Sequence, residues 1–336
     1  MFAANPEKLK VVKEIGRREA VFAMARVPGS RRLYFGGSDF AVHEIDLDEE
    51  KPEAKELGRH ESYVTGLALA GAGATLVSGS YDGHLIWWNT ASRSQVRSVS
   101  AHGKWIRNVV ATPDGRTIAS VADDMICRLW DAETGQLIRA LKGHEEKTPH
   151  HFPSMLYACA VSADSRYVAT GDKVGLVNVW EIESGKKLAS VEAPVMYTWD
   201  PVQRRHSIGG IRSLAFSPDG TRIAAGGIGT IGNIDHLDGK ARIEVFDWQK
   251  GERTHELASD TYKGLVEHLQ FHPGGDWLLA AGGSESGFLI VFDLAGKKVI
   301  GHEKMPMHVH KLAAGDDPET LFAVGDKKLA ILSMAE

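Results

Sequence analysis

IRNVVATPDGRTIASVADDMICRLWDAETGQLIRALKGH, residues 106–144, contains one complete structural unit of the chain. Its first two apolar runs, residues 106–111 and 117–122, flank the break TPDGR, where Pro and Gly supply the backbone angles of a tight turn. A third apolar run, MICRLWD, and a fourth, GQLIRALKGH, follow after further turn residues. Short β-prone runs separated by turn clusters predict a four-stranded antiparallel unit.

The first half of this unit recurs along the whole chain. Seven windows of nineteen residues, each with two apolar runs around a turn cluster, begin near residues 21, 64, 106, 156, 211, 266 and 309. Most windows are followed by a third run, and several by a fourth, with no long helical period between them. The pattern predicts an all-β fold in which residues 1–336 form a single seven-bladed β-propeller of four-stranded antiparallel blades.

The ends of the runs resemble a known family. Gly143-His144, Trp130-Asp131 and Ser-Gly-Ser-Tyr-Asp-Gly (residues 78–83) are similar to the signatures of WD-repeat proteins. The resemblance covers nearly the whole chain but is degenerate, because Trp130-Asp131 is the one full Trp-Asp pair at the end of a third run. The corresponding pairs elsewhere are Trp88-Asn89, Trp180-Glu181, Phe246-Asp247, Phe292-Asp293, Ile45-Asp46 and Leu332-Ser333.

The last window is followed by one more apolar run, LAILSMAE, and then the sequence ends. Near the start, KLKVVKEIGR is similar to the fourth run of other units. We therefore expect residues 7–16 to form the outer strand of blade seven and close the ring. Closure of this kind is usual in the family that the chain resembles, and it leaves no unpaired strand edge.

A Ser, a His and an Asp recur at identical offsets in blades two and three, which invites a hydrolase interpretation. An active site seldom recurs in adjacent repeats, and the WD-repeat resemblance implies that these residues and a Trp form a structural hydrogen-bonded tetrad. We therefore expect no catalytic residues and no enzyme activity. Blade four keeps His144, Thr170 and Trp180 but has Val174 where the Asp is expected. The two complete tetrads are His60, Ser78, Asp82 and Trp88, and His102, Ser120, Asp124 and Trp130.

Three insertions indicate a binding face. Successive windows begin 43, 42, 50, 55, 55 and 43 residues apart, and the additions fall in residues 145–154, 194–210 and 228–241. All three leave the same face of the predicted disc, above blades four and five, where long loops commonly carry function. We expect a protein or peptide to dock there, unless the loops merely cover blade edges. Candidate contacts are Tyr63, Tyr81, Trp105 and Phe152, with Tyr197, Trp199, Arg204 and Arg205 as main anchors.

Histidines on the same face suggest an alternative, a metal or small-ligand site. Met305, Met307, His308 and His310 offer soft and imidazole ligands, but no fixed-spacing motif joins the histidines and the face has no cysteine. A metal is therefore not expected, and no cofactor is assigned. The candidate ligands for this alternative are His150, His151, His206, Asp235 and His236.

Composition limits the partners. Lys and Arg number 39 against 44 Asp and Glu, for a net charge of −5, so nucleic acid is not an expected partner. No run of eighteen apolar residues and no secretory signal are visible, which argues against a membrane span or export. Two cysteines, Cys127 and Cys159, cannot form a disulfide scaffold. We expect a monomeric propeller in the cytoplasm, with a partner whose identity the sequence does not reveal.

Overall fold

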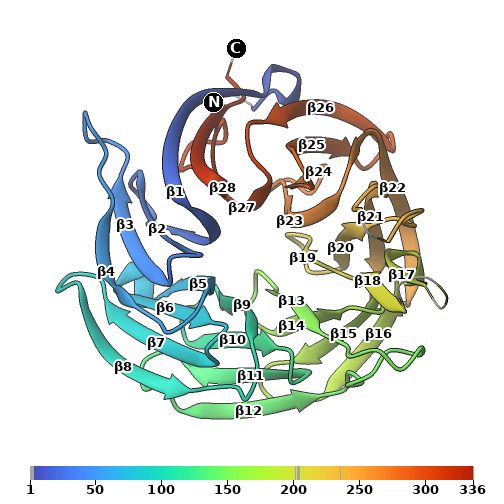
Figure 1. Cartoon of the computed structure of the whole chain (residues 1–336), viewed down its shortest axis with the longest axis horizontal. Coiled ribbons are helices and arrows are strands. Elements are labelled where there is room, and N and C mark those ends of the chain that lie inside the picture. The colour runs from blue at the N-terminus through green and yellow to red at the C-terminus, as the bar shows by residue number, and fades with distance from the viewer. Residues whose placement is uncertain (1–3, 201, 203–204, 235, 336) are drawn as a thin grey trace.

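The computed structural model describes residues 4–200, 202, 205–234 and 236–335. Large antiparallel sheets follow one another around a ring. In each of them, the strand at one edge of the sheet lies nearest the centre of the ring (Figure 1). This is an all-β propeller, as the repeat pattern predicts. No helix in the described part of the chain has the length and apolar character needed to cross a membrane.

Five sheets of the described chain have four strands each, and each sheet uses consecutive strands. Their inner strands begin with the apolar run of a predicted window, and their outer strands are the more polar runs. The sheets are β5 (Val64–Ala70), β6 (Thr75–Ser80), β7 (His84–Asn89) and β8 (Ser94–Ser100); β9 (Ile106–Ala111), β10 (Thr117–Ala122), β11 (Ile126–Asp131) and β12 (Leu137–Lys142); β13 (Leu156–Val161), β14 (Tyr167–Asp172), β15 (Leu176–Glu181) and β16 (Lys187–Glu192); β19 (Ser213–Phe216), β20 (Arg222–Ile228), β21 (Lys240–Asp247) and β22 (Glu252–Lys263); and β23 (Leu265–Phe271), β24 (Trp277–Gly283), β25 (Gly287–Asp293) and β26 (Lys298–Met305).

The sixth large sheet joins the two ends of the chain and differs from the prediction. It has six strands in the order β27-β28-β1-β2-β3-β4. The prediction of seven separate four-stranded blades is therefore not confirmed, because the described strands form six large sheets. The cause is that two strands are continuous where the sequence predicts breaks. The strands are β1 (Lys10–Arg26), β2 (Arg32–Gly37), β3 (Ala41–Asp46), β4 (Lys55–Arg59), β27 (Val309–Ala314) and β28 (Thr320–Ser333).

Strand β1 pairs with β28 through its first part and with β2 through its second, and so joins the two halves of this sheet. Its first part runs antiparallel to β28 from Lys10 opposite Ser333 to Gly16 opposite Lys328, and the register then shifts before Ala20. Its second part, from Val21, pairs with β2. The backbone N–H of Asn5 also donates to the carbonyl of Met334, at 3.1 Å. The two ends of the chain consequently lie side by side (Figure 1).

The first residue of every predicted window is completely buried. Its side chain belongs in every case to one of the apolar clusters that pack the large sheets. Each of the seven has an exposed fraction of 0 %. They are Val21, Val64, Ile106, Leu156, Ile211, Val266 and Val309.

Apolar clusters of the described residues fill the spaces between neighbouring sheets. One cluster, for example, packs Val77 and Trp87 of one sheet against Ile106 and Ile118 of the next. Six clusters lie between consecutive sheets in this way. A seventh cluster lies within the six-stranded sheet, between Phe322 of β28 and residues of β1, β2 and β3.

The second insertion contains structure that the sequence analysis does not predict. Residues Tyr197–Asp200 (β17) and His206–Gly209 (β18) form a two-stranded hairpin that stands apart from the large sheets. The remaining elements are three short 3-10 turns, η1 (Pro6–Lys8), η2 (Gly71–Gly73) and η3 (Pro194–Met196).

Candidate functional site

The second residues of the seven predicted windows meet around the axis of the ring. In six of the windows this second residue is the extra residue at a register shift between the first two strands of the repeat, and such a bulge turns its side chain out of the regular alternation. They line a cavity of about 220 Å³ together with Tyr81, Asn108 and Lys311. The seven residues are Phe22, Thr65, Arg107, Tyr157, Arg212, Glu267 and His310.

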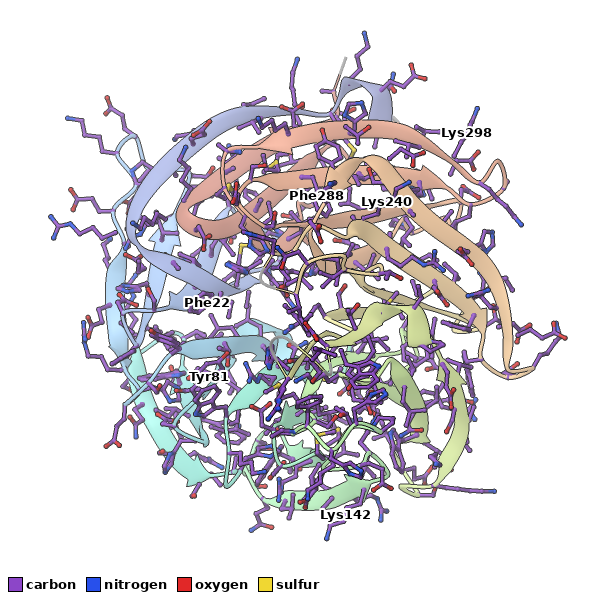
Figure 2. The ribbon with its side chains drawn as sticks, turned by 45° about the vertical axis from the view of Figure 1, so that its right-hand side comes forward. Phe22, Tyr81, Lys142, Lys240, Phe288 and Lys298 are labelled. Atoms are coloured by element: carbon purple, nitrogen blue, oxygen red, sulfur yellow. The ribbon has the colours of Figure 1, made fainter. Side chains whose placement is uncertain are left out.

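A chain of aromatic rings extends from this cavity across the face of the first two repeats. Phe22 and Phe40 both lie against Tyr63, with ring centroids 5.7 and 5.5 Å away. Tyr63 contacts Tyr81 at 5.7 Å, and Tyr81 stacks on Trp105 at 4.6 Å with an interplanar angle of 5°. We call these five residues the aromatic ladder. Figure 2 labels Phe22 and Tyr81 within it.

Three members of the aromatic ladder are open to solvent. Trp105 is 51 % exposed, Tyr63 40 % and Phe40 36 %. Exposed apolar side chains are ordinary when isolated, but contiguous ones on a rigid surface mark binding sites. Tyr63, Tyr81 and Trp105 are predicted from the sequence, and the structure brings them into one group. Phe22 and Phe40 are not predicted, although Phe22 is the second residue of its window and this position can be compared across all repeats.

Arg107 fixes the end of the aromatic ladder. Its guanidinium lies 4.9 Å from the ring centroid of Tyr81 and 5.2 Å from that of Trp105. It also donates to the hydroxyl of Tyr81 at 2.5 Å and pairs with the carboxylate of Asp123 at 2.7 Å. Burial raises the pKa of Tyr81 against the opposing effect of the arginine, so the phenol stays neutral at physiological pH.

The insertions form a second aromatic group. His150 stacks on Trp199 with centroids 3.6 Å apart, and its Nδ1 lies 3.2 Å from the hydroxyl of Tyr197. That hydroxyl donates to Thr148 at 3.0 Å. Tyr197 therefore joins two insertions, whereas Trp199, 40 % exposed, remains available to solvent.

The remaining predicted contacts on the insertions are Phe152, Arg204 and Arg205. Phe152 is partly buried in the first insertion, and Arg205 is exposed, with a φ of 48°. Arg204 lies outside the described residues. The third insertion contacts the hairpin through the backbone N–H of Ile231, which donates to the Thr198 hydroxyl at 3.3 Å. The three insertions thus support one another above the fourth and fifth repeats.

Both predicted tetrads are assembled as closed networks. His60 lies 3.0 Å from Asp82 through Nδ1 and 2.7 Å from the Ser78 hydroxyl through Nε2, while Trp88 donates to the same hydroxyl at 2.8 Å. The network of His102, Asp124, Ser120 and Trp130 has matching distances of 3.1, 2.8 and 2.9 Å. Neither histidine side chain has any solvent exposure. A serine so enclosed cannot reach a substrate, so the arrangement has no nucleophile to offer.

Hydrogen bonding keeps the tetrad carboxylates ionised. Burial opposes ionisation of Asp82, but hydrogen bonds from His60 and from the backbone N–H groups of His84 and Glu61 outweigh it and lower the pKa to about 2. In the second tetrad, burial is likewise outweighed by His102 and Arg128, and the pKa of Asp124 is also about 2. These carboxylates therefore act as permanent acceptors.

The fourth repeat has its carboxylate at an unexpected position. His144 lies 2.8 Å from Asp172 and 2.8 Å from the Thr170 hydroxyl, to which Trp180 donates at 3.1 Å. Asp172 is two residues before Val174, where the sequence pattern expects the acid. The expectation of an incomplete network is wrong, because a carboxylate earlier in the turn reaches the same histidine. Gly143 is required beside it, since a Cβ there would meet the Trp180 ring at 2.7 Å.

The histidines proposed for a metal on the looped face do not gather. His150 is engaged with Trp199, and His151, His206 and His236 are exposed; Asp235 lies outside the described residues. Within the described chain, the groups of three ligating side chains are elsewhere, in Glu267, His308 and His310 and in Glu19, Asp39 and His43. The looped face is thus not favoured as a metal site.

Comparison with known proteins identifies the repeats. The family model for the WD domain, G-beta repeat, matches residues 52–89, 93–131 and 199–243. The chain is 28 % identical to WD repeat-containing protein SL1-17 of Schistosoma mansoni over 177 residues, which is 49 % of this chain and 52 % of that protein. It is 28 % identical to eukaryotic translation initiation factor 3 subunit I of Pyricularia oryzae over 171 residues, 50 % of this chain and 43 % of the subunit.

A third relative, nuclear distribution protein PAC1-2 of Uncinocarpus reesii, is 25 % identical over 217 residues, 60 % of this chain and 42 % of that protein. The chain spans about half the length of the curated relatives that it matches.

Proposed function

The chain belongs to the WD-repeat family of β-propellers, and from this premise we propose that it is a non-enzymatic scaffold that docks a protein or peptide on the face carrying the aromatic ladder. The observation that carries this proposal is the group of three exposed rings, Phe40, Tyr63 and Trp105. Phe40 lies directly against Tyr63, and Tyr81 joins Tyr63 to Trp105. Aromatic and Arg side chains are the types that dominate binding energy at protein interfaces.

Preorganisation supports the same proposal. The ring contacts and the hydrogen bond between Arg107 and Tyr81 hold the aromatic ladder before any partner arrives. Binding then requires little further ordering of side chains, a cost of about 0.5–1.5 kcal/mol for each one immobilised. The exposed Trp199 and Arg205 on the insertions supply a second contact region for a larger partner.

Features of the relatives and of the tetrads favour a scaffold over an enzyme. One relative is named as a subunit of a translation initiation factor, and a subunit works through contacts with other chains. The Ser-His-Asp sets that could suggest hydrolysis are enclosed structural networks. The partner of this chain is therefore sought among proteins and peptides rather than among small substrates.

The experiment is a quantitative comparison of captured partners. Wild-type protein, Trp105→Ala and Tyr63→Ala are used as baits in the native cell extract, with Leu137→Ala as the matched control, because Leu137 is 51 % exposed on the outer strand β12. We expect the same protein to be retained by wild type and Leu137→Ala and lost from both ladder variants, all with unchanged Tm. Equal capture by all four baits would contradict the docking site.

We further propose that the six-stranded sheet comprises two blades, which makes the ring seven-bladed and residues 7–16 the outer strand of the seventh. Three observations support this division: the register shift between Gly16 and Ala20, the seven equivalent buried window residues, and the apolar cluster between β28 and β1–β3, which resembles those between separate sheets.

Removal of residues 1–17 tests the closure. The deletion removes Lys10 to Gly16, the part of β1 that pairs with β28, and so exposes a strand edge. We therefore expect a loss of several kcal/mol in the free energy of unfolding, as for other disruptions of a packed core. Thermal unfolding measures the effect. A Tm equal to that of the intact chain would show that this strand is dispensable.

We also propose a monomeric ring that functions in the cytoplasm without nucleic acid. Cys127 and Cys159 are free and buried, a state that a reducing compartment preserves, and burial raises the pKa of the Cys159 thiol to about 12. The net charge of −5 disfavours binding to phosphate backbones.

A further inference from the structure

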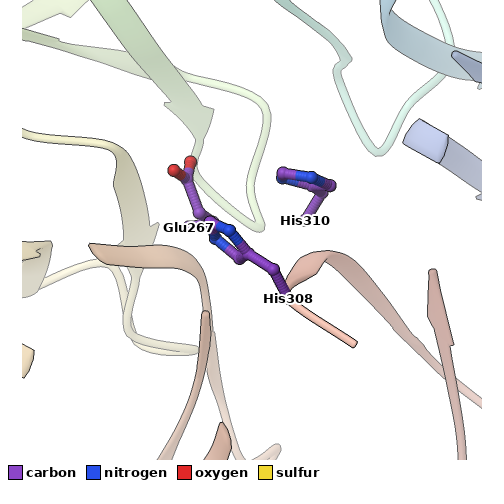
Figure 3. A group of neighbouring side chains, drawn as sticks. All are labelled: Glu267, His308 and His310. Carbon is purple, nitrogen blue, oxygen red and sulfur yellow. The ribbon is translucent and has the colours of Figure 1, made fainter. Parts of the chain in front are cut away.

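Three ligating side chains lie together beside the central cavity, and two of them, Glu267 and His310, line it. Glu267, His308 and His310 each contribute a ligand atom, and these atoms lie within 4.8 Å of one another. Figure 3 shows the three side chains gathered from two neighbouring sheets, with Glu267 on β23, His310 on β27 and His308 immediately before β27. Residues far apart in sequence meet here because the inner strands converge on the axis.

One ring nitrogen of this cluster lacks a hydrogen-bond partner. The Nε2 of His308 is buried and has no hydrogen bond. A buried polar atom without a partner is destabilising, so such atoms are normally satisfied. His308 lies beside a second imidazole and a carboxylate, the side chains that commonly ligate transition-metal ions.

His310 is oriented as metal-binding histidines are. Its Nε2 lies 3.1 Å from the Asp326 carboxylate, which leaves Nδ1 available as a ligand atom. Histidines that bind a metal usually donate their other ring N–H to a carboxylate or carbonyl, which fixes the tautomer and the ring. The His310 ring also rests edge-on against Phe22, at 5.2 Å, so its position is fixed from two sides.

We propose that Glu267, His308 and His310 form a binding site for a divalent transition-metal ion of the Zn²⁺ class, with Asp326 as the group that positions His310. Two imidazoles and one carboxylate suit Zn²⁺ and its borderline neighbours better than Ca²⁺ or Mg²⁺, which prefer all-oxygen ligands.

The surrounding charges set the strength of binding. The carboxylates of Glu267 and Asp326 offset the charge of the ion, whereas Arg212 and Lys311 line the same cavity and oppose it. We therefore expect binding in the micromolar range, rather than the tight binding of a structural zinc site. An ion with three protein ligands keeps a further position for water or for a group of a docked partner.

Metal titration of the whole chain, prepared without a His-tag and stripped with a chelator, tests the site. Zn²⁺ binding is followed by calorimetry, and Co²⁺ binding by its visible absorption. We expect one equivalent to bind wild type, and binding to be lost in His308→Ala, His310→Ala and Glu267→Gln. His206→Ala removes an exposed histidine outside the cluster and serves as the control, which should bind as wild type does. No stoichiometric binding to wild type, or unchanged binding in His308→Ala, would overturn the proposal.

Asp326 has a separate readout. Asp326→Asn should weaken Zn²⁺ binding about 10–100-fold, as loss of an outer carboxylate does at other sites. Without metal, the Tm of this variant should equal that of wild type, because the side chain is about half exposed. Zn²⁺ should raise the Tm of wild type but not of His308→Ala. An equal rise in both proteins would place the ion elsewhere and contradict the assignment.

Discussion

Two sheets of the ring differ in the partners that they provide for their buried polar groups. The sheet of β5–β8 encloses the His60 tetrad, whose members stand at offsets repeated in the next sheet. The sheet of β19–β22 has instead a buried carboxylate, Glu244, which pairs with Arg242 at 2.7 Å and Arg253 at 3.1 Å. The tetrad is a pattern of hydrogen bonds that is repeated in the next sheet. The Glu244 network is a set of ion pairs particular to one repeat.

The difference shows that a repeat without a tetrad needs another set of partners for its buried polar groups. Glu244 is completely buried and pairs with two arginines, whereas the Asp82 carboxylate of the first tetrad accepts from a histidine and from backbone N–H groups. We expect the charge network to be the more sensitive of the two to loss of one member.

Glu244→Ala should therefore have the largest effect. It leaves Arg242 nearly buried, with Glu256 as its remaining partner, and we expect a loss of about 3–5 kcal/mol in the free energy of unfolding. Glu256→Ala, at a side chain 49 % exposed, is the control and should cost less than about 1 kcal/mol. Urea unfolding measures both, and equal losses would remove the distinction between the two sheets.

Ser78→Ala should cost somewhat less, about 1–3 kcal/mol, because it leaves the Trp88 indole N–H and the His60 Nε2 without their shared partner. Ser120→Ala should behave alike, since its network has matching distances. Ser78→Thr should recover most of the stability, as Thr170 fills this position in the fourth repeat. A neutral Ser78→Ala in chemical unfolding would mean that the tetrad contributes nothing.

Acid should weaken the tetrads in a defined range. The folded pKa of Asp82 is about 2, below its ordinary value of 3.8, so its contribution is fully present above pH 4 and is lost as the pH falls toward 2. The loss is on the order of 2 kcal/mol. The stability difference between wild type and Asp82→Asn should accordingly shrink across this range. A difference that stays constant from pH 5 to pH 2 would exclude the ionised carboxylate as its source.

The smallest effect is expected at the position where the sequence pattern places the acid of the fourth repeat. Val174→Asp should change the free energy of unfolding by less than about 0.5 kcal/mol, because the Asp172 carboxylate already pairs with the His144 ring. Asp172→Asn should instead destabilise the chain. A clear gain from Val174→Asp in thermal unfolding would indicate that the network was incomplete.

These contrasts show where sequence reasoning succeeds. The tetrads and the seven buried window residues could be predicted because identical offsets place side chains on identical faces. The hairpin of β17 and β18, the role of Asp172 and the continuity of β1 could not, since they depend on local turns and on pairing between distant segments. The cluster of Glu267 and His310 combines residues of two repeats, so no spacing within either repeat predicts it.

The central claim, that a partner docks on the aromatic ladder, is tested most directly by photo-crosslinking in the native cell. Phe40 is replaced by p-benzoylphenylalanine, and Val299, 41 % exposed on β26, receives the same group as a control. The account predicts that one protein is crosslinked from position 40 and is absent at position 299. Crosslinks to that protein from position 299 alone would contradict it.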